Sequence, residues 1–435
     1  MIATERVPQA LERAGFGPVR EAEARHSAAL GVGPLPEVAP REPKQVAELL
    51  RFCAGERLAC VPVGGGTELF LGGAPGRVDF LLSTAGLSGV VEYAPADLTL
   101  TARAGTTLGV LSETVARNLH EVPLEPAGGE WASLGGILAA ASDGPRRLGW
   151  GAARDQVLGI AVAHPDGTVA RAGGRVVKNV TGYDLPRLHT GAQGTLGVIL
   201  EATIRLRPKA RASKAAGIAF HELDGAAAFL RALRSGPFRP TALDLLDPQA
   251  AQAVFAKEFG AGWLVLARMD GEEAGVEAEG TRLRALASEK AGRVVPLSPP
   301  HRALLSDPRR IARGRPALWL RASTVPSMVP TFLERIHREA EGRPLAALAR
   351  AGIGTVHVLA GEEFPRSEIL AAVGAARATA RGLGGSLLVV DAPPDLRRGL
   401  PLWGEAPGGI AVMRRLRGLF DPEGVLSPGR FVEGP

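Results

Sequence analysis

Cysteine is scarce in this chain, which has only Cys53 and Cys60 among 435 residues. The six residues between them include a polar turn, so the pair forms neither a CxxC motif nor a metal-ligand spacing. We therefore expect no disulfide scaffold, no zinc site and no other metal centre. Two thiols are also too few to hold an iron–sulfur cluster within this chain.

Aromatic residues make up only 5% of the sequence, and lysine occurs only six times. The formal net charge is +6, and no basic run is interleaved with aromatic residues. A nucleic-acid partner is therefore not expected. The positive charge is carried almost entirely by arginine, which suits an anionic small molecule or the surface of a protein partner equally well.

Long apolar runs are absent. No segment is long enough to cross a bilayer, and the N-terminus lacks the basic stretch and apolar core of a secretory leader. We expect a cytoplasmic protein without a transmembrane segment. Any association with the cytoplasmic face of the inner membrane would be peripheral and would run through partners.

The chain is long enough for two or three domains, each with its own core. Apolar strands and glycine-rich turns dominate up to about residue 208. From about Arg211 strand-like and helical runs alternate in two β-α-β cycles, which indicate an open α+β sheet with helices on one face.

The first of three glycine-rich turns is Gly64-Gly65-Gly66-Thr67, directly after the apolar strand 58–63. Consecutive glycines after a strand can aim several backbone N–H groups at one point, which suits a phosphate. The turn is not a Walker loop, and Leu69 stands where GxGxxG needs its third glycine. A plain tight turn explains this segment equally well.

Two further glycine-rich turns follow. Ser133 and the pair Gly135-Gly136 lie in a run of small residues that lets the backbone pack against something flat or charged. The stretch 173–201 holds six glycines, and its tight turn from Gly194 to Gly197 feeds directly into an apolar strand. By itself, such a stretch is only a connection between core strands; three in order indicate a ligand.

In this order the turns resemble the FAD-binding module of the vanillyl-alcohol-oxidase (PCMH-type) class of flavoproteins. The matching segments are VPVGGGT (61–67), SLGG (133–136), KNVTGYDL (178–185) and GTLG (194–197). Four further segments narrow the resemblance within this class: GPRR (144–147), RDQVLG (154–159), FDPEG (420–424) and PGR (428–430). With them, most of the chain is similar to the FAD-binding subunits of glycolate oxidase (glycolate dehydrogenase).

The resemblance implies an α+β fold, in which a two-part PCMH-type FAD-binding domain is followed by an antiparallel α+β (ferredoxin-like) cap. The expected segments are an N-terminal helix and lead-in (1–37), the FAD-binding domain (38–208), a cap or substrate domain (211–400), and a C-terminal segment that returns to the FAD domain (401–435).

The resemblance also implies a set of FAD-binding residues. The first turn would cradle the pyrophosphate, the second would close on it, and the main chain at 198–199 would meet the adenine. Neutral N–H groups can bind a diphosphate without ordering long side chains. The full set is Pro62, Val63, Gly64, Gly65, Gly66, Thr67, Ser133, Gly135, Gly136, Arg146, Lys178, Asn179, Gly182, Tyr183, Gly194, Gly197, Val198, Ile199 and Arg430.

Some of these residues have simpler interpretations. Arg146 would screen the pyrophosphate or merely face solvent, and Tyr183 would approach the flavin or form a packing corner. Thr67 follows the glycines where some relatives carry a tethering histidine, and neither cysteine lies in such a context. We therefore expect non-covalent FAD.

Three residues are candidates for catalysis. Lys178 would stabilise the anionic reduced flavin near its N1–C2=O edge, or pair with Asp184. Arg321 alternates with apolar neighbours on a predicted strand and would bind a carboxylate, or face a surface or interface. His357 would be a base, although a core or interface histidine is the simpler interpretation.

His357 is the one histidine in GTVHVLAG (354–361), where catalytic relatives carry a His-x-Gly-Asp-Gly-Asn-x-His metal and substrate motif. A lone histidine is a poor divalent-metal site. Ser427 also replaces the asparagine that relatives often carry in the tail.

The leading functional hypothesis is a FAD-containing subunit of a glycolate dehydrogenase complex. It would oxidise a small 2-hydroxy acid, glycolate to glyoxylate, with an iron–sulfur subunit and a second, homologous flavoprotein subunit as partners. The alternatives are a stand-alone FAD-dependent D-2-hydroxy-acid (D-lactate-type) dehydrogenase and a non-catalytic flavin relay or structural subunit. The missing histidine motif favours the relay over the stand-alone enzyme.

Overall fold

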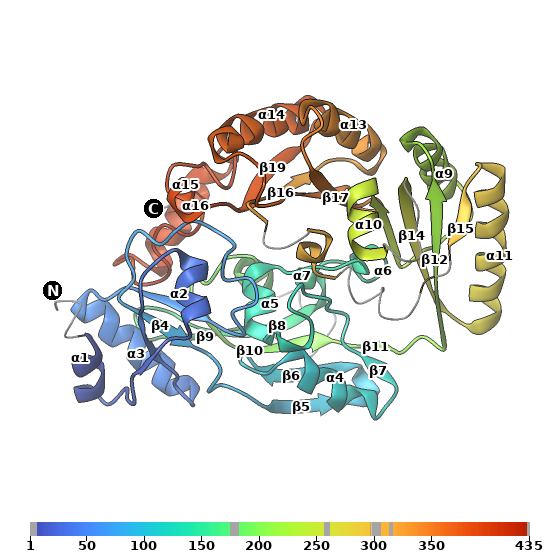
Figure 1. The fold of residues 1–435 in the computed structure, drawn as a ribbon. Helices are drawn as coiled ribbons and strands as arrows, with labels where there is room; N and C mark the ends of the chain where they lie inside the picture. Colours follow the sequence, from blue (N-terminus) through green and yellow to red (C-terminus); the bar gives the residue numbers. More distant parts are fainter. Residues whose placement is uncertain are drawn as a thin grey trace. The chain divides into compact units, whose positions relative to one another are not determined.

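The computed structural model describes residues 7–174, 182–255, 262–295, 297, 306–312 and 316–432. The chain divides into two compact units, and each is described here by itself. Unit 1 comprises Met1–Ser142, Ala152–Lys209 and Glu405–Pro435, and unit 2 comprises Asp143–Gly151 and Ala210–Gly404. Figure 1 follows the chain from blue to red through both.

Unit 1 begins with a four-stranded sheet of order β1-β2-β4-β3, in which β2, β4 and β3 run parallel. Its strands and helices are β1 (Arg20–Glu21), β2 (Pro36–Val38), β3 (Cys60–Val63), β4 (Phe80–Ser83), α1 (Val7–Arg13), α2 (Ala24–Leu30) and α3 (Pro43–Glu56). All four residues of β4 are buried, as expected for a parallel strand covered on both faces. The glycine turn follows β3, which places it at the carboxyl end of this sheet.

The second sheet of unit 1 is antiparallel, with the order β5-β6-β10-β8-β9. Its strands are β5 (Val90–Ala94), β6 (Thr99–Arg103), β8 (Val157–Ala163), β9 (Val169–Gly173) and β10 (Val198–Arg205). The associated elements are η2 (Pro95–Asp97), α4 (Leu108–Ala116), η3 (Gly129–Trp131), α5 (Leu134–Ala140), α7 (Ala153–Gln156), α8 (Leu185–His189), and the strand pair β7 (His120–Glu121) and β11 (Arg207–Pro208). The glycine turn after Ser133 opens α5, and the turn ending at Gly197 opens β10.

One hydrophobic core joins the two sheets of unit 1. Helix α3 directs Val46, Leu49 and Leu50 inward at helical spacing, as its sequence pattern predicts. They pack in one cluster with Phe80 and Leu82 of the first sheet, and with residues of the second, Ala161, Ala163, Val198 and Leu200. The core therefore fixes the first glycine turn and the start of β10 within one body.

The C-terminal segment adds to the open edge of β3. Leu426 forms a parallel bridge with Cys60, whose N–H donates to Val425 O at 2.8 Å. After helix α16 (Ile410–Phe420) the Asp421 carboxylate accepts the N–H groups of Val425 and Leu426, both at 2.8 Å. Burial raises the pKa of Asp421 above its usual value. The tail is thus part of unit 1.

Unit 2 contains an eight-stranded sheet built from two β-α-β-β-α-β repeats. The first is β12 (Ala212–Phe220), α9 (Leu223–Ser235), β13 (Ala242–Leu246), β14 (Trp263–Gly271), α11 (Glu273–Glu289) and β15 (Arg293–Val295). The second is β16 (Leu318–Ser323), α13 (Val329–Glu339), β17 (Leu345–Arg350), β18 (Thr355–Ala360), α14 (Ile369–Gly382) and β19 (Ser386–Asp391). The remaining elements are α6 (Arg147–Trp150), α10 (Pro248–Phe255), η4 (Pro308–Ile311), η5 (Pro326–Met328), η6 (Arg366–Glu368) and α15 (Pro394–Arg397).

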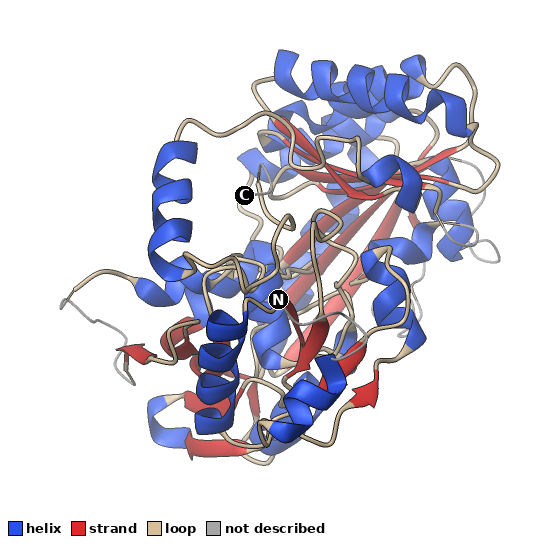
Figure 2. Ribbon diagram, turned by 90° about the vertical axis from the view of Figure 1, so that its left-hand side faces the viewer, coloured by secondary structure: helices blue, strands red, loops and turns tan. Residues whose placement is uncertain are grey.

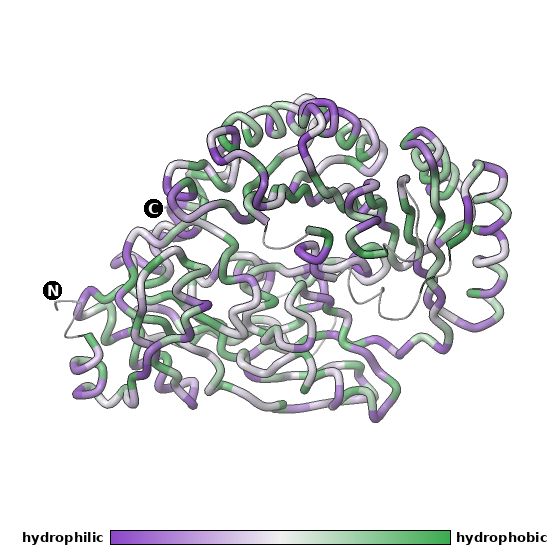
Figure 3. Tube along the Cα trace, viewed as in Figure 1, coloured by the Kyte–Doolittle hydropathy of each residue, from purple (hydrophilic) through white to green (hydrophobic). Residues whose placement is uncertain are grey.

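The strand order is β15-β12-β14-β13-β17-β18-β16-β19, and each repeat follows the ferredoxin-like pattern. The repeats meet where the second strand of one pairs antiparallel with the second strand of the other, β13 with β17. This confirms the predicted antiparallel α+β cap. The long helices show alternating hydrophobic green and hydrophilic purple in Figure 3 and lie against the strands in Figures 1 and 2.

The two faces of the sheet differ in chemistry. Helices α9, α11, α13 and α14 share one core with alternate strand residues such as Leu320, Ala349 and Val358. The intervening residues point to the other face, where Asp244 and Arg350 meet at 2.9 Å across the β13–β17 junction. Their side chains are only 3% and 5% exposed. The junction of the two repeats is therefore bridged by a buried ion pair.

Replacing one partner of this pair is expected to destabilise unit 2. Arg350→Met leaves the Asp244 carboxylate buried beside an apolar side chain, at a cost of about 3–5 kcal/mol. The double variant Asp244→Leu/Arg350→Met is expected to recover most of that loss, because no charge is then left buried. Urea unfolding of the three proteins measures this, and a double variant as unstable as Arg350→Met would contradict it.

Candidate functional site

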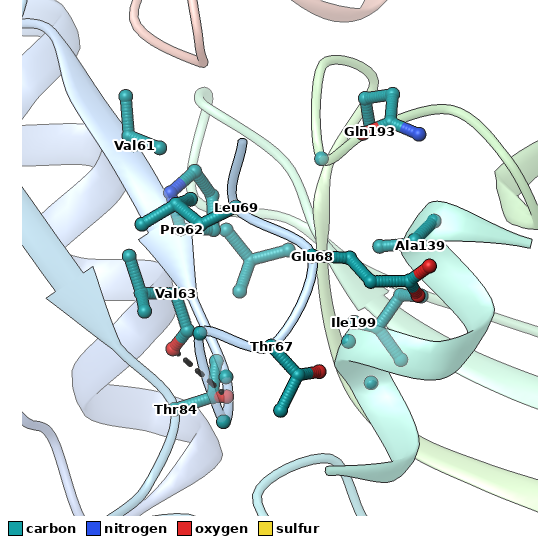
Figure 4. Close-up of a pocket in the computed structure, with 18 of the residues that line it drawn as sticks. Val61, Pro62, Val63, Thr67, Glu68, Leu69, Thr84, Ala139, Gln193 and Ile199 are labelled. Carbon is teal, nitrogen blue, oxygen red and sulfur yellow. Dashed lines mark hydrogen bonds between the residues drawn. The ribbon is translucent and has the colours of Figure 1, made fainter. Parts of the chain in front are cut away.

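The three glycine-rich turns line one pocket in unit 1, with a cavity volume of about 90 Å³. Figure 4 shows the strand end at Val61–Val63, the following turn, α5 and Gln193 around this space. The lining residues are Val61, Pro62, Val63, Gly64, Gly65, Gly66, Thr67, Glu68, Leu69, Thr84, Gly135, Gly136, Ala139, Ala140, His189, Gln193, Gly194, Gly197, Val198, Ile199 and Arg430.

The first turn consists of glycines because its neighbours leave no room for a Cβ. A Cβ on Gly64 would overlap the Ser133 hydroxyl, and one on Gly65 would overlap the Trp131 carbonyl. Gly66 has a φ of +69°, and there a Cβ would overlap the imidazole of His26. The turn is therefore packed on all sides except toward the pocket.

One side chain connects the first turn with the second. The Ser133 hydroxyl accepts the Gly65 N–H at 3.1 Å and also the Gly136 N–H at 3.4 Å, as the N-cap of α5. Ser133 is not among the lining residues. Its contribution is to hold two backbone segments that are 68 residues apart in sequence.

The turn has backbone donors to offer to a ligand. Among the described residues, the N–H groups of Gly64, Gly66 and Thr67 donate to no acceptor. These residues are half-buried, so their N–H groups are strong donors available to an anionic or strongly polar ligand in the pocket.

The third turn is attached to the far end of α5. The N–H groups of Gly191 and Gln193 donate to Leu138 O and Ala139 O, both at 2.9 Å. Gly194 has a φ of +67°, and a Cβ on Gly197 would overlap Val162. The second and third turns are therefore held to the same short helix, and the pocket lies beside it.

Arg430 lines the pocket, and its side chain hydrogen-bonds to the backbone of the pocket wall. The guanidinium donates to Leu69 O at 2.8 Å, Leu71 O at 2.7 Å and Gly73 O at 3.3 Å. It is 3% exposed. It fixes the chain that follows the glycine turn, so its expected role in cofactor binding becomes one of positioning.

His189 lines the pocket, although no sequence motif pointed to it. It is buried, and its ring contacts His164 and Phe420 with centroids 5.7 and 5.9 Å away. Burial, with a smaller effect of the His164 charge, lowers the pKa of His189 to about 4. The imidazole is therefore neutral near pH 7. Val61, Glu68, Leu69, Thr84, Ala139, Ala140 and Gln193 were missed as well.

Several predicted cofactor residues lie elsewhere. Arg146 belongs to unit 2, where its guanidinium lies 3.6 Å from the centre of the Trp150 ring. Tyr183 is 93% exposed, and Gly182 precedes it without lining the pocket. Lys178 and Asn179 lie outside the described residues. Their predicted roles stay predictions.

Arg321 and His357, the other two predicted catalytic residues, are paired neighbours on β16 and β18 of unit 2. Both are on the sheet face opposite the helix core. The Trp319 indole N–H donates to His357 Nδ1 at 3.1 Å, so the neutral ring carries its proton on Nε2. Burial, then the positive charges of Arg350 and Arg321, hold the pKa of His357 well below its ordinary value.

Two negative findings concern the described residues only. No three His, Cys, Asp or Glu side chains there are grouped so that they could hold a metal ion. No helix in that part of the chain has the length and the apolar character needed to span a membrane.

Two families match the sequence. They are "FAD binding domain" over residues 34–173 and "FAD linked oxidases, C-terminal domain" over residues 403–431. The second match covers the tail that pairs with β3. In these two segments the chain is similar to FAD-linked oxidases.

The chain is 27% identical to glycolate oxidase subunit GlcD of Bacillus subtilis (strain 168), over 91% of this chain and 88% of that protein. It is 43% identical to glycolate oxidase subunit GlcE of Escherichia coli (strain K12), over 29% of this chain and 36% of that protein. Its fold matches 4-ethylphenol oxidase from Gulosibacter chungangensis with a TM-score of 0.73 at 16% identity, over 100% of this chain and 98% of that one. The predicted PCMH-type fold class is thereby confirmed.

The pocket fits the cofactor that the matched domain implies. A diphosphate needs close backbone approach and available N–H donors, and the first turn provides both. The pocket also holds an apolar wall at Val198 and Ile199, both buried, which suits a flat ring system. The pocket therefore has the residues to hold FAD through the backbone rather than through charged side chains.

The contact between Gly64 and Ser133 is expected to control FAD affinity. Gly64→Ala forces the two turns apart at about 1–3 kcal/mol, or roughly 5- to 150-fold weaker FAD binding. Ser133→Ala removes the hydroxyl that the new Cβ would strike and also loses the cap, at about 0.5–2 kcal/mol. In a fluorescence titration with FAD, the double variant should therefore lose less binding free energy than the two single variants lose together.

Gly55→Ala is the matched control for this cycle, because a Cβ at Gly55 meets nothing within 4 Å and its φ is ordinary. It is expected to bind FAD like the unmodified chain. Strictly additive losses in the double variant would show that the two residues act independently.

His189 is expected to make unit 1 sensitive to acid. Its folded pKa of about 4 lies below the unfolded value of 6.5, so the unfolded chain binds the proton more tightly. Stability should therefore fall as the pH drops below 6.5, by about 2 kcal/mol between pH 7 and pH 5 for this group. His189→Gln should lose that part of the pH dependence in urea unfolding, whereas His221→Gln, at an exposed site, should keep it. Equal pH dependence in both variants would contradict this.

Proposed function

We propose that the chain is a FAD-dependent 2-hydroxy-acid oxidoreductase and works as a subunit of a glycolate-oxidising complex. The similarity to a glycolate oxidase subunit over 91% of the chain is the observation that carries this proposal. A shorter match to a second glycolate oxidase subunit supports a complex with a homologous flavoprotein partner.

Bound FAD would supply the acceptor for a hydride from the α-carbon of the substrate. Gly64, Gly66 and Thr67 would hold its diphosphate, and Ser133 and Arg430 would keep their backbone in place. A carboxylate repels phosphate but accepts hydrogen bonds from hydroxyl groups, so Glu68 would serve the sugar part of the cofactor. Lys178 would oppose the negative charge of the reduced ring.

FAD would be held without a covalent bond. Burial raises the pKa of both thiols, Cys53 and Cys60, well above the usual value. Both thiols are therefore protonated at neutral pH and poor nucleophiles, and Thr67 offers no reactive ring. Denaturation of the loaded chain is expected to release all of its flavin.

The substrate carboxylate would bind Arg321, whose guanidinium can grip both of its oxygens. His357 would act as a hydrogen-bond donor toward the substrate through Nε2, because Trp319 occupies Nδ1. General-base action by His357, as the sequence pattern suggested, would require Trp319 to release that nitrogen. The positive charge of Arg321 near His357 also favours an anionic substrate.

The electrons would then leave for an iron–sulfur partner. The chain has two cysteines, and the structure holds both in buried, unpaired form. A cluster therefore has to come from another subunit, and any membrane association would run through that partner.

A flavin relay without substrate turnover is the second candidate. It is favoured by two features of β18. A single histidine is too few to bind a metal ion, and His357 is not available as a base while its Nδ1 accepts the Trp319 N–H. In this case the homologous partner subunit would carry out the oxidation.

The deciding experiment adds glycolate and then D-lactate to the FAD-loaded chain without oxygen. We expect the visible flavin absorbance to bleach. Arg321→Met should raise the substrate concentration for half-maximal bleaching by roughly 10- to 150-fold, the equivalent of ~1.5–3 kcal/mol for a charged hydrogen bond. Arg338→Met, on the exposed side of α13, is the control and should bleach normally.

A flavin spectrum that neither acid bleaches would reject turnover by the isolated chain and leave the relay. A chain that binds no FAD on titration would reject both.

A further inference from the structure

Unit 2 has a cavity of about 360 Å³ between α13 and α14, on the helix-covered face of its sheet. The two helices lie side by side in Figure 1. Arg321 and His357 are on the opposite face of the same strands, so the cavity is separate from the proposed substrate residues.

The floor of the cavity is apolar. It consists of core residues of β16 and β18, Leu318, Leu320, Val358 and Ala360, with Phe364 beside them. Leu320 and Phe364 are buried, whereas Ala371 and Ala375 at its side are exposed. The cavity therefore runs from the surface to apolar side chains of the core, and an apolar group that covered them would be favoured over water.

The cavity exists because small side chains line its helical walls. Ala371, Ala372, Ala375 and Ala376 of α14 line it, with Ile336 of α13 and Ala340, the residue that follows α13.

The mouth of the cavity carries a net negative charge. Three carboxylates line it, those of Glu339, Glu341 and Glu368, against one guanidinium, Arg343. Arg343 lies 2.7 Å from Glu368 and 3.8 Å from Glu341, and Glu339 accepts the Thr379 hydroxyl. The one positive charge is already paired, so an added anion would meet repulsion and an added cation attraction.

We propose that unit 2 binds a small cationic amphiphile here, with its hydrocarbon part between α13 and α14 and its positive group among the carboxylates at the mouth. The site is independent of the FAD pocket and of the proposed oxidation.

Three probes with the same eight-carbon chain test this by calorimetry on the full-length FAD-loaded protein: octyltrimethylammonium, octan-1-ol and octanoate. We expect saturable binding of one octyltrimethylammonium per chain, weaker binding of octanol, and at least tenfold weaker binding of octanoate. Glu368→Gln should reduce the difference in affinity between octyltrimethylammonium and octanoate.

Ala372→Phe fills the cavity and should abolish binding of all three probes. Ala378→Phe, on the same helix but outside the lining, is the matched control and should bind as the unmodified chain does. Ala375→Leu is a milder filling variant, expected to weaken binding even where Ala372→Phe disturbs folding. Flavin absorbance reports separately that unit 1 is intact.

Lack of saturable binding of octyltrimethylammonium to the unmodified chain would overturn the proposal, as would equal affinities for the cation and octanoate. Binding that survives both filling variants would overturn it too, because the probe would then sit elsewhere.

Discussion

The hydroxyl of Ser133 is the contact on which the FAD pocket depends. It accepts N–H groups from Gly65 and Gly136, and it thereby joins the end of the parallel sheet to the start of α5. This short distance excludes a Cβ at Gly64. An anion site made from backbone needs such external support, because a glycine-rich segment otherwise loses more conformational entropy than any other on folding.

The support comes from distant parts of the chain. His26 of α2 packs against Gly66, Ser133 caps α5, and Arg430 of the tail binds the carbonyls that follow the turn. Both ring nitrogens of His26 are buried without a hydrogen-bond partner, which normally costs stability. The turn can therefore take its shape only once all three segments are folded, and bound cofactor should stabilise unit 1 as a whole.

Local patterns predicted much of this arrangement. Glycine-rich segments beside apolar strands or among small residues located the three turns, and the alternation after Arg211 predicted the open α+β sheet that unit 2 contains. Long-range pairing could not be predicted. Arg146 follows a Gly-Pro pair and resembled a phosphate ligand, but its segment packs within unit 2, where Gly149 donates to Thr241 O at 3.0 Å. His189 lacks any motif and reaches the pocket only because α8 returns to the end of β8.

The two faces of the unit 2 sheet show how a repeated fold can serve two purposes. In both repeats, alternate side chains of a strand point to opposite faces of the sheet. Each strand therefore supplies apolar residues to the helix-covered face and leaves the other face free to carry polar residues. At the β13–β17 junction, the face opposite the helices carries polar residues, the buried ion pair of Asp244 and Arg350. On the helical face, the second repeat has alanines where α14 meets α13. Filling that space with larger side chains would be expected to stabilise the protein. The hollow therefore lowers the stability of unit 2, and a ligand bound in it would offset that loss.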